Sequence, residues 1–431
     1  MVEHAESATQ PLGPVMLPGP STGASSVGVS PPQRPSLRDA TGLLSGTVLL
    51  GLGEKLGERF IPLFLVNLGG GALAVGLHQA ATNLVGAAAA LPGGYMTDRI
   101  GSKRALQWFA ALASLGFALL VFASRWPLAI AGALMALSWS AVSLPAALVL
   151  ITRAIPTRNT AWGVSLHSLV RRVPMAVGPL VAGALVAARG EVLGLRIAFA
   201  VALALGVVTI VAQQLLIRPA AVRATSDHAS ARAPFRPLAA LRSMNRPLRD
   251  LFIADTLIRF CEQIPYAFVV LWCMREIPRP VSAWVFGQLT AIEMVVAMLV
   301  YAPGAWLSSR IGKPAAVAIT FAFFFAFPLA LMGSRSYGAL VFAFALRGLK
   351  EIGEPTRKSL ILDLCPEDAR ATHFGWYYCV RDSLAAVAAA LGALLWHASP
   401  AANLIAAAAF GMAGLAWYTA AALRAGRVRP A

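Results

Sequence analysis

Long apolar stretches, separated by short polar segments, run through most of this chain. Proline, glycine and clusters of charge divide the sequence into twelve such stretches, at 43–66, 72–97, 105–123, 127–152, 160–187, 196–217, 250–273, 282–308, 314–333, 338–364, 372–396 and 402–423. A helix needs roughly 20 mostly apolar residues to cross the hydrocarbon core of a bilayer. The pattern therefore predicts an all-α membrane protein with twelve transmembrane helices.

Charged residues are distributed unevenly among these stretches. The third, sixth, ninth and twelfth contain no charge in their middles, whereas the first, fifth, seventh, eighth, tenth and eleventh do. An ionisable side chain at the centre of a bilayer costs about 2.5 to 3.5 kcal/mol on insertion scales, so it faces protein or water. We therefore expect every third helix to face lipid, and the others to enclose a polar cavity.

Composition agrees with a membrane location. The chain is 58% hydrophobic and 13% charged, with mean hydropathy +0.69, which is too apolar for one soluble core. The net charge of +17 does not indicate a nucleic-acid partner, because no basic module interleaved with aromatic residues accompanies it. Alternate connections and the two tails carry 20 basic residues, against 6 in the other connections. By the positive-inside rule both termini face the cytoplasm, as expected of a multi-pass protein of the cytoplasmic membrane.

The chain also contains an internal repeat. The segment 92–103 matches 303–314 without a gap, with Gly93/Gly304, Arg99/Arg310 and Gly101/Gly312 each 211 positions apart, and Gly76/Gly287 keeps this register. A period near half the chain length predicts two pseudo-symmetric six-helix bundles. We place their boundaries as follows: a disordered cytoplasmic tail at 1–41, bundles at 42–217 and 250–423, a basic cytoplasmic linker at 218–249, and a second tail at 424–431.

The segment between the second and third stretches resembles the signature of the major facilitator superfamily. Gly94, Asp98, Arg99 and Gly101 match its G-x-x-x-D-R-x-G motif, and basic residues follow. The resemblance implies that family's fold and a conformational latch at Gly94, Asp98, Arg99, Gly101, Arg310 and Gly312, although Ser309 replaces the acid in the second copy. A plain positive-inside anchor is the alternative to a latch. In the fifth stretch, Gly178, Pro179 and Gly183 match part of an antiporter signature.

Buried acids are candidates for carrying protons. Glu54 and Glu58 are four residues apart and share a helix face, where two carboxylates raise one another's proton affinity. The candidates for proton coupling are Glu54, Glu58, Glu262, Glu293, Glu351, Glu354 and Asp382. Salt-bridge networks that hold the helices together are the alternative.

Basic and aromatic residues in the same stretches are candidates for the substrate cavity. They are His167, Arg171, Arg172, Arg259, Arg347, Lys350, Trp376, Tyr377 and Arg381. The fork of an arginine suits carboxylate or phosphate groups. The alternative is that these arginines neutralise acids across the interface between the halves.

The sequence contains no nucleotide-binding loop, no catalytic motif and no metal-ligand spacing among its four cysteines. We therefore predict no enzyme, no metal and no cofactor. We predict a monomeric secondary transporter that moves a small organic solute by alternating access, coupled to protons, with lipid around it and export as the favoured direction. Uptake of an anionic metabolite is the first alternative. The second is a non-transporting sensor or lipid-moving protein on the same scaffold.

Overall fold

Helices make up all the regular structure described in a computed structural model of the chain. The described residues are 37–137, 139, 160–217, 244–367 and 370–427. Six helices in these ranges are long and apolar enough to cross a membrane, and eight are when two bent pairs count as one span each. The structure therefore confirms the predicted all-α membrane fold.

Seven predicted stretches each form one continuous helix. They are α3 (Gly71–Ile100), α4 (Ser102–Phe122), α7 (Thr160–Arg189), α8 (Glu191–Leu216), α14 (Lys313–Gly333), α17 (Arg370–Ala398) and α18 (Pro400–Arg427). The fourth stretch begins as α5 (Trp126–Ala136), and most of its remainder lies outside the described residues.

Four other stretches are broken, which corrects the expectation of uninterrupted spans. The first stretch forms α1 (Leu37–Glu58) and α2 (Ile61–Asn67), and the eighth forms α12 (Ala283–Leu299) and α13 (Tyr301–Ile311). The seventh forms α10 (Arg246–Tyr266), α11 (Val269–Leu271) and the π-helical η3 (Trp272–Glu276). The tenth forms α15 (Tyr337–Leu349), the 3-10 turn η4 (Lys350–Gly353) and α16 (Glu354–Leu364). A proline lies at or near each break: Pro62, Pro265, Pro303 and Pro355. Proline removes a backbone donor and clashes with the preceding turn, so it bends or ends a helix.

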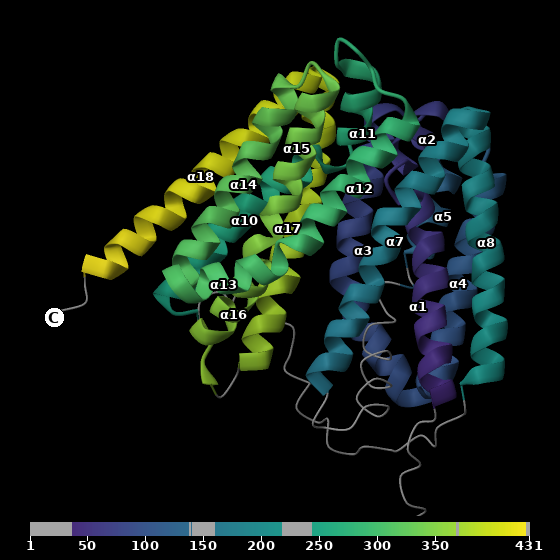
Figure 1. The fold of residues 1–431 in the computed structure, drawn as a ribbon, viewed down its shortest axis with the longest axis horizontal. Helices are drawn as coiled ribbons and strands as arrows, with labels where there is room; N and C mark the ends of the chain where they lie inside the picture. The colour runs from purple at the N-terminus through teal and green to yellow at the C-terminus, as the bar shows by residue number, and fades with distance from the viewer. Residues whose placement is uncertain (1–36, 138, 140–159, 218–243, 368–369, 428–431) are drawn as a thin grey trace, which may run out of the picture. The chain divides into compact units, whose positions relative to one another are not determined.

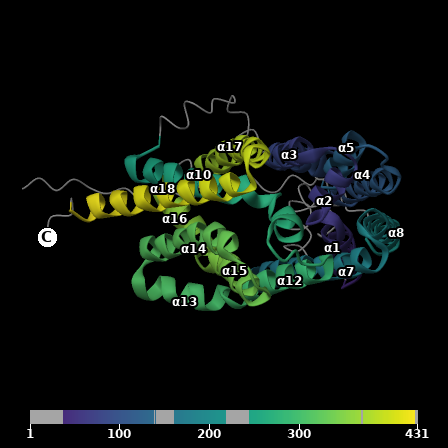
Figure 2. The same ribbon diagram turned by 90° about the horizontal axis from the view of Figure 1, so that it is seen from above.

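The helices pack in two groups (Figures 1 and 2). In the first group α1 packs on α7 and α8, and α4 packs on α5 and α8; in the second, α10 packs on α17 and α18, and α14 packs on α15 and α18. The predicted lipid-facing helices α4, α8 and α18 expose large apolar side chains, including Trp108, Leu215 and Met412. Large apolar side chains are also exposed on α3, α7, α12 and α17, so the lipid-facing position of every third helix stays a prediction.

The most extensive contacts between the groups are those of α3 with α17 and of α7 with α12. Glycine permits the close approach in both pairs. A Cβ at Gly76 would lie 2.2 Å from Cβ of Ala393, and one at Gly287 would lie 2.5 Å from the carbonyl oxygen of Pro179. Gly76 and Gly287 are the repeat-related pair found in the sequence, so the repeat places a small residue at both crossings.

The repeated motif also ends two helices in the same way. Gly101 precedes α4 with φ +85°, and Gly312 precedes α14 with φ +84°. A residue with a side chain rarely adopts this conformation, which explains the glycine in both copies. Gly94, Asp98 and Arg99 lie on α3, but their side chains fall outside the described part, so the latch stays a prediction. Arg310 lies on α13, with its guanidinium 5.5 Å from the ring centroid of Trp306.

Candidate functional site: a charged cavity between the two helix groups

A cavity of about 260 Å³ lies between the two groups of helices. The breaks after α1 and α10 border it, because Arg59 and Ala267 are among its lining residues. Its polar wall consists of Glu54, Glu58, Arg59, His78, Gln79, Thr82, Asn83, Arg259, Glu262, Gln263, Tyr266 and Arg347. The rest of the wall is mostly apolar and includes Phe117, Leu120, Phe199 and Phe286. The cavity can therefore hold a small solute with both polar and apolar parts.

One wall carries an excess of negative charge. Glu54 and Glu58 both bind the ammonium of Lys55, which lies 2.9 Å from Oε1 of Glu54 and closer still to Oε2 of Glu58. The second oxygen of Glu54, Oε2, is buried without a hydrogen-bond partner among the described residues, and so is Nδ1 of His78. One cation thus serves two carboxylates here, and an unpartnered acceptor remains at the cavity.

Another part of the lining has more cations than acids among its ion pairs. Arg59 and Arg347 share one carboxylate oxygen, Oε1 of Glu293, at 3.5 Å and 3.3 Å. Both guanidinium groups also lie near the ring of Tyr266, at 5.1 Å and 5.5 Å from its centroid. Because Arg59 follows α1 and Glu293 is on α12, this cluster joins the two groups of helices.

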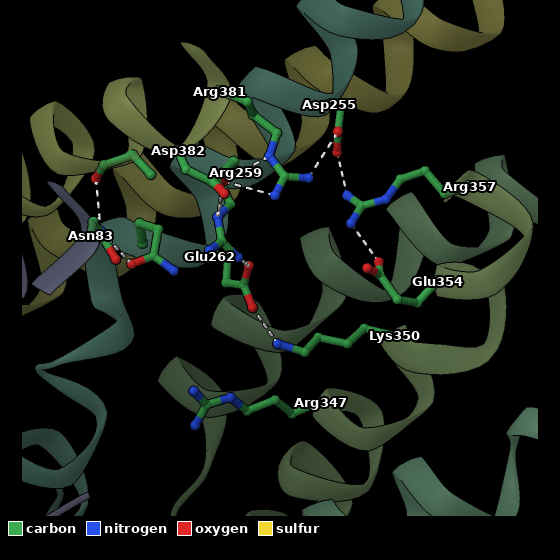
Figure 3. Close-up of polar contacts among 12 residues, drawn as sticks. Asn83, Asp255, Arg259, Glu262, Arg347, Lys350, Glu354, Arg357, Arg381 and Asp382 are labelled. Atoms are coloured by element: carbon green, nitrogen blue, oxygen red, sulfur yellow. Dashed lines mark hydrogen bonds and ion pairs between the residues drawn. The ribbon is translucent and has the colours of Figure 1, made fainter. Parts of the chain in front are cut away.

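A second ion-pair chain runs from the cavity into the C-terminal helices (Figure 3). The carboxylate of Glu262 lies 2.5 Å from both Lys350 and Arg259, and Arg259 in turn lies 3.8 Å from Asp382. The charges of this chain alternate, so each buried cation has an acid beside it. Such pairing is what keeps charged groups tolerable inside a membrane protein.

Behind this chain lies Asp255, which is fully buried. Its carboxylate accepts hydrogen bonds from Arg357, from Arg381 at 3.2 Å and from the hydroxyl of Tyr377 at 3.0 Å. Glu354 and Asp382 are the further partners of Arg357 and Arg381 respectively (Figure 3). Asp255 therefore ties α10 to α16 and α17.

Polar contacts also cross between the groups beside the cavity. Arg172 on α7 binds the hydroxyl of Tyr301 and lies 3.7 Å from Glu351, which accepts from that hydroxyl at 3.0 Å. On the other side, Asn83 and Gln79 on α3 donate to Gln263 on α10, at 2.9 Å and 3.2 Å.

The structure brings together some of the sequence candidates and separates others. Glu54, Glu58, Arg259, Glu262 and Arg347 line the cavity. Glu293, Lys350 and Asp382 form ion pairs with these lining residues. The other candidates described with side chains are not among the lining residues, namely Arg172, Glu351, Glu354, Trp376, Tyr377 and Arg381. His167 and Arg171 lie on α7 with side chains outside the described part. No comparison tests the roles of these residues, so the roles stay predictions.

Sequence reasoning missed the neutral polar residues of α3. His78, Gln79 and Asn83 line the cavity, yet the second stretch carries no formal charge that would mark them as candidates. The available signal was their spacing, since Gln79 and Asn83 are four residues apart and share one helix face. Among the described residues, no group of three or more His, Cys, Asp or Glu side chains is placed to hold a metal ion.

Comparison with known proteins identifies the family. The model of the Major Facilitator Superfamily matches residues 43–389. No curated protein matches the chain. Among solved structures, the peptide transporter POT in complex with sulfate is similar with TM-score 0.69 at 16% identity, covering 90% of this chain and 94% of that one.

Two further structures show the same similarity of fold. A POT family transporter in complex with 5-aminolevulinic acid has TM-score 0.69 at 12% identity, covering 90% of this chain and 96% of that one. The nucleoside transporter NupG, as a mutant, has TM-score 0.70 at 13% identity, covering 90% and 98%. Because the family model matches most of the sequence and the fold agrees over about nine-tenths of it, this chain belongs to the Major Facilitator Superfamily of membrane transporters.

Proposed function

We propose that the protein is a proton-coupled secondary transporter of a small organic solute, working by alternating access at the cavity. The observation that carries this proposal is the cavity between the two groups of helices, which is lined by acids and bases from both groups. The bundles at 42–217 and 250–423, joined by the linker at 218–249, are the two bodies that would move. We propose a monomer in the cytoplasmic membrane, because each bundle of the pair supplies half of one site.

Contacts at one end of the cavity support alternating access. Arg275 lies 2.5 Å from Glu191, and the glycine crossings of α3 with α17 and of α7 with α12 lie toward the same end. If both termini are cytoplasmic, as the arginine distribution predicts, these contacts close the outer end. Transport then requires that they separate while contacts form at the cytoplasmic end.

Glu58 is our first candidate for the proton carrier. It lines the cavity, its side chain is 32% exposed, and it pairs with Lys55. A proton on Glu58 removes one charge from the wall that already has two acids for one cation. Loading and release of this proton would thereby alter the attraction between the wall and a cationic group in the cavity.

Replacing Glu58 by Gln is expected to abolish accumulation driven by a pH gradient while leaving exchange of solute, because the variant binds but cannot carry the proton. The measurement is uptake and counterflow in proteoliposomes, with a solute found by thermal-shift screening. Glu367→Gln is the matched control, since Glu367 has 94% of its side chain exposed. Gradient-driven accumulation by Glu58→Gln at the parental level would place the carrier elsewhere.

The charges of the cavity favour a solute that carries both signs. The Glu54 wall has one carboxylate more than its cation, and the Arg59 and Arg347 cluster has one cation more than its carboxylate. A zwitterion with an apolar side chain would complement both charged clusters and the phenylalanine residues of the lining. The carboxylate of such a zwitterion would also agree with the anion-binding role predicted for the arginines.

Apolar amino acids or dipeptides are therefore expected to bind at least tenfold more tightly than their amides or N-acetyl derivatives. Each derivative lacks one of the two charges and so leaves one charged part of the lining without a partner. Thermal-shift titration of matched sets measures this. Glu54→Gln should lower the preference for a free amine and leave the preference for a free carboxylate; Arg347→Gln should do the reverse. Equal binding of all three forms would contradict a zwitterion site.

We also propose that Asp98 and Arg99 act as a cytoplasmic latch between the bundles. The motif match and the turn at Gly101 support this. A carboxylate near a facing helix N-terminus gains about 0.3 to 1 kcal/mol from the helix dipole. Asp98→Asn is expected to slow transport at equal expression, and Asp250→Asn, near the start of α10, is a control. If Asp98→Asn transports at the parental rate, the segment is not a latch and serves only as a positive-inside anchor.

The direction of transport, export or uptake, is a separate proposal. The partial antiporter signature on α7 favours export, whereas the similar structures named above are those of peptide and nucleoside transporters. Transport in liposomes that responds to an imposed pH gradient supports the transporter over a sensor. Lipid movement without a gradient would instead favour the lipid-moving alternative.

A further inference from the structure

A groove of about 540 Å³ lies on the surface of α4 and α8, separate from the central cavity. Arg104, Gln107 and Trp108 line it from α4, and Val211, Gln214 and Leu215 line it from α8. Trp108 and Leu215 are 66% and 78% exposed, so the groove opens outward. In a multi-pass membrane protein an outward-facing surface of this kind meets the bilayer.

The groove is polar at one end and apolar at the other. Arg104 lies in the first turn of α4, and Ala111 lies about 10 Å further along the helix at 1.5 Å per residue. On α8 the order is matched, because Gln214 and Leu215 end the helix while Val211 lies one turn before them. The groove therefore changes from polar to apolar along the direction in which a lipid extends from headgroup to acyl chain.

Local hydrogen bonds fix the polar end and leave one cation available. Gln107 donates to the side-chain oxygen of Gln214 at 2.6 Å, and the ammonium of Lys103 donates to the backbone oxygen of Gln214 at 3.0 Å. Arg104 is exposed and makes no ion pair within the described part of the chain. Two cations thus lie at the polar end of the groove, and none of the described residues that line it is an acid.

We propose that this groove binds one anionic phospholipid, with the phosphate at Arg104 and an acyl chain along Trp108, Ala111 and Val211. Basic pockets between transmembrane helices favour anionic headgroups, and tryptophan favours the interface beside them. The complementary charge selects an anionic lipid, and the apolar floor selects a lipid over a soluble anion. This site is independent of the solute cavity and of the transport that we propose there.

Native mass spectrometry of the purified full-length protein tests this site, with phosphatidylglycerol and phosphatidylcholine of the same acyl chains. The parent is expected to bind phosphatidylglycerol at least fivefold more tightly than phosphatidylcholine. Arg104→Gln should remove this preference, and Ala111→Phe, which fills the groove, should weaken binding of both lipids.

Arg125→Gln is the matched control, because Arg125 is an exposed arginine just beyond the other end of α4. It should leave the preference unchanged. Melting temperatures of the variants establish that they remain folded. A preference that survives in Arg104→Gln, or is lost equally in Arg125→Gln, would overturn the site.

Discussion

Replacing Asp255 by Asn is expected to destabilise the protein by about 3 to 5 kcal/mol, the cost of breaking a buried ion pair by removing one partner. Asp255 has no exposed surface and joins Arg357, Arg381 and Tyr377. Asparagine has nearly the same shape, so packing is kept while the shared negative charge is lost. The remaining acids, Glu354 and Asp382, each reach only one of the two arginines among the ion pairs described.

Unfolding in detergent, followed by tryptophan fluorescence, measures this effect. Asp363→Asn is the control, because Asp363 pairs with Lys313 while half of its side chain is exposed. A surface pair of this kind contributes about 0 to 1 kcal/mol. A loss of stability in Asp255→Asn no larger than in Asp363→Asn would mean that the buried cluster does not hold the C-terminal helices together.

Replacing Gly76 by Val is expected to reduce transport at least a hundredfold, because the two helix groups can no longer close on each other at this crossing. A Cβ at Gly76 would lie 2.2 Å from Cβ of Ala393 and 3.3 Å from the carbonyl oxygen of Ala389. These atoms belong to the packed part of α17 and cannot yield without moving that helix. Gly287→Val, at the repeat-related crossing of α12 with α7, should have a similar effect.

Gly86→Val is the matched control on α3, since a Cβ there would meet no atom within 4 Å. Initial transport rates measure the expected loss of turnover. Labelling of a cysteine placed in the cavity wall measures whether the cavity stays accessible from the outer side. Parental transport by Gly76→Val, or an equal loss in Gly86→Val, would contradict a role for the glycine crossing.

The positions of the helices in the described residues followed closely from the sequence, because hydrocarbon excludes unpaired backbone groups and so forces long apolar segments into helices. The breaks did not follow. Pro62, Pro265 and Pro303 were visible, but a proline bends one transmembrane helix and is accommodated in another, as Pro174 and Pro179 are within α7. Which outcome occurs depends on the neighbours that satisfy the freed carbonyl groups.

The candidate site was predicted in part. Charge alone picked out Glu54, Glu58 and Glu262, since a buried ionisable group must face a polar interior. It also picked out Glu351 and Arg381, which lie in ion pairs away from the cavity. It missed Asn83, whose amide joins α3 to Gln263 on α10 across the two groups. Periodicity tells which face of a helix is polar, but not which partner that face meets.

The sequence by itself determined the all-helical membrane fold, the repeat that relates Gly76 to Gly287, and the helices on which ionisable groups must avoid lipid. These properties depend on local composition and on the cost of charge in hydrocarbon. The tertiary structure alone decided which charges pair and which face the cavity, for example that Arg59 and Arg347 share Glu293 while Glu54 keeps an unpartnered oxygen. That assignment depends on distances of a few ångströms between segments far apart in the chain, which spacing along one helix does not encode.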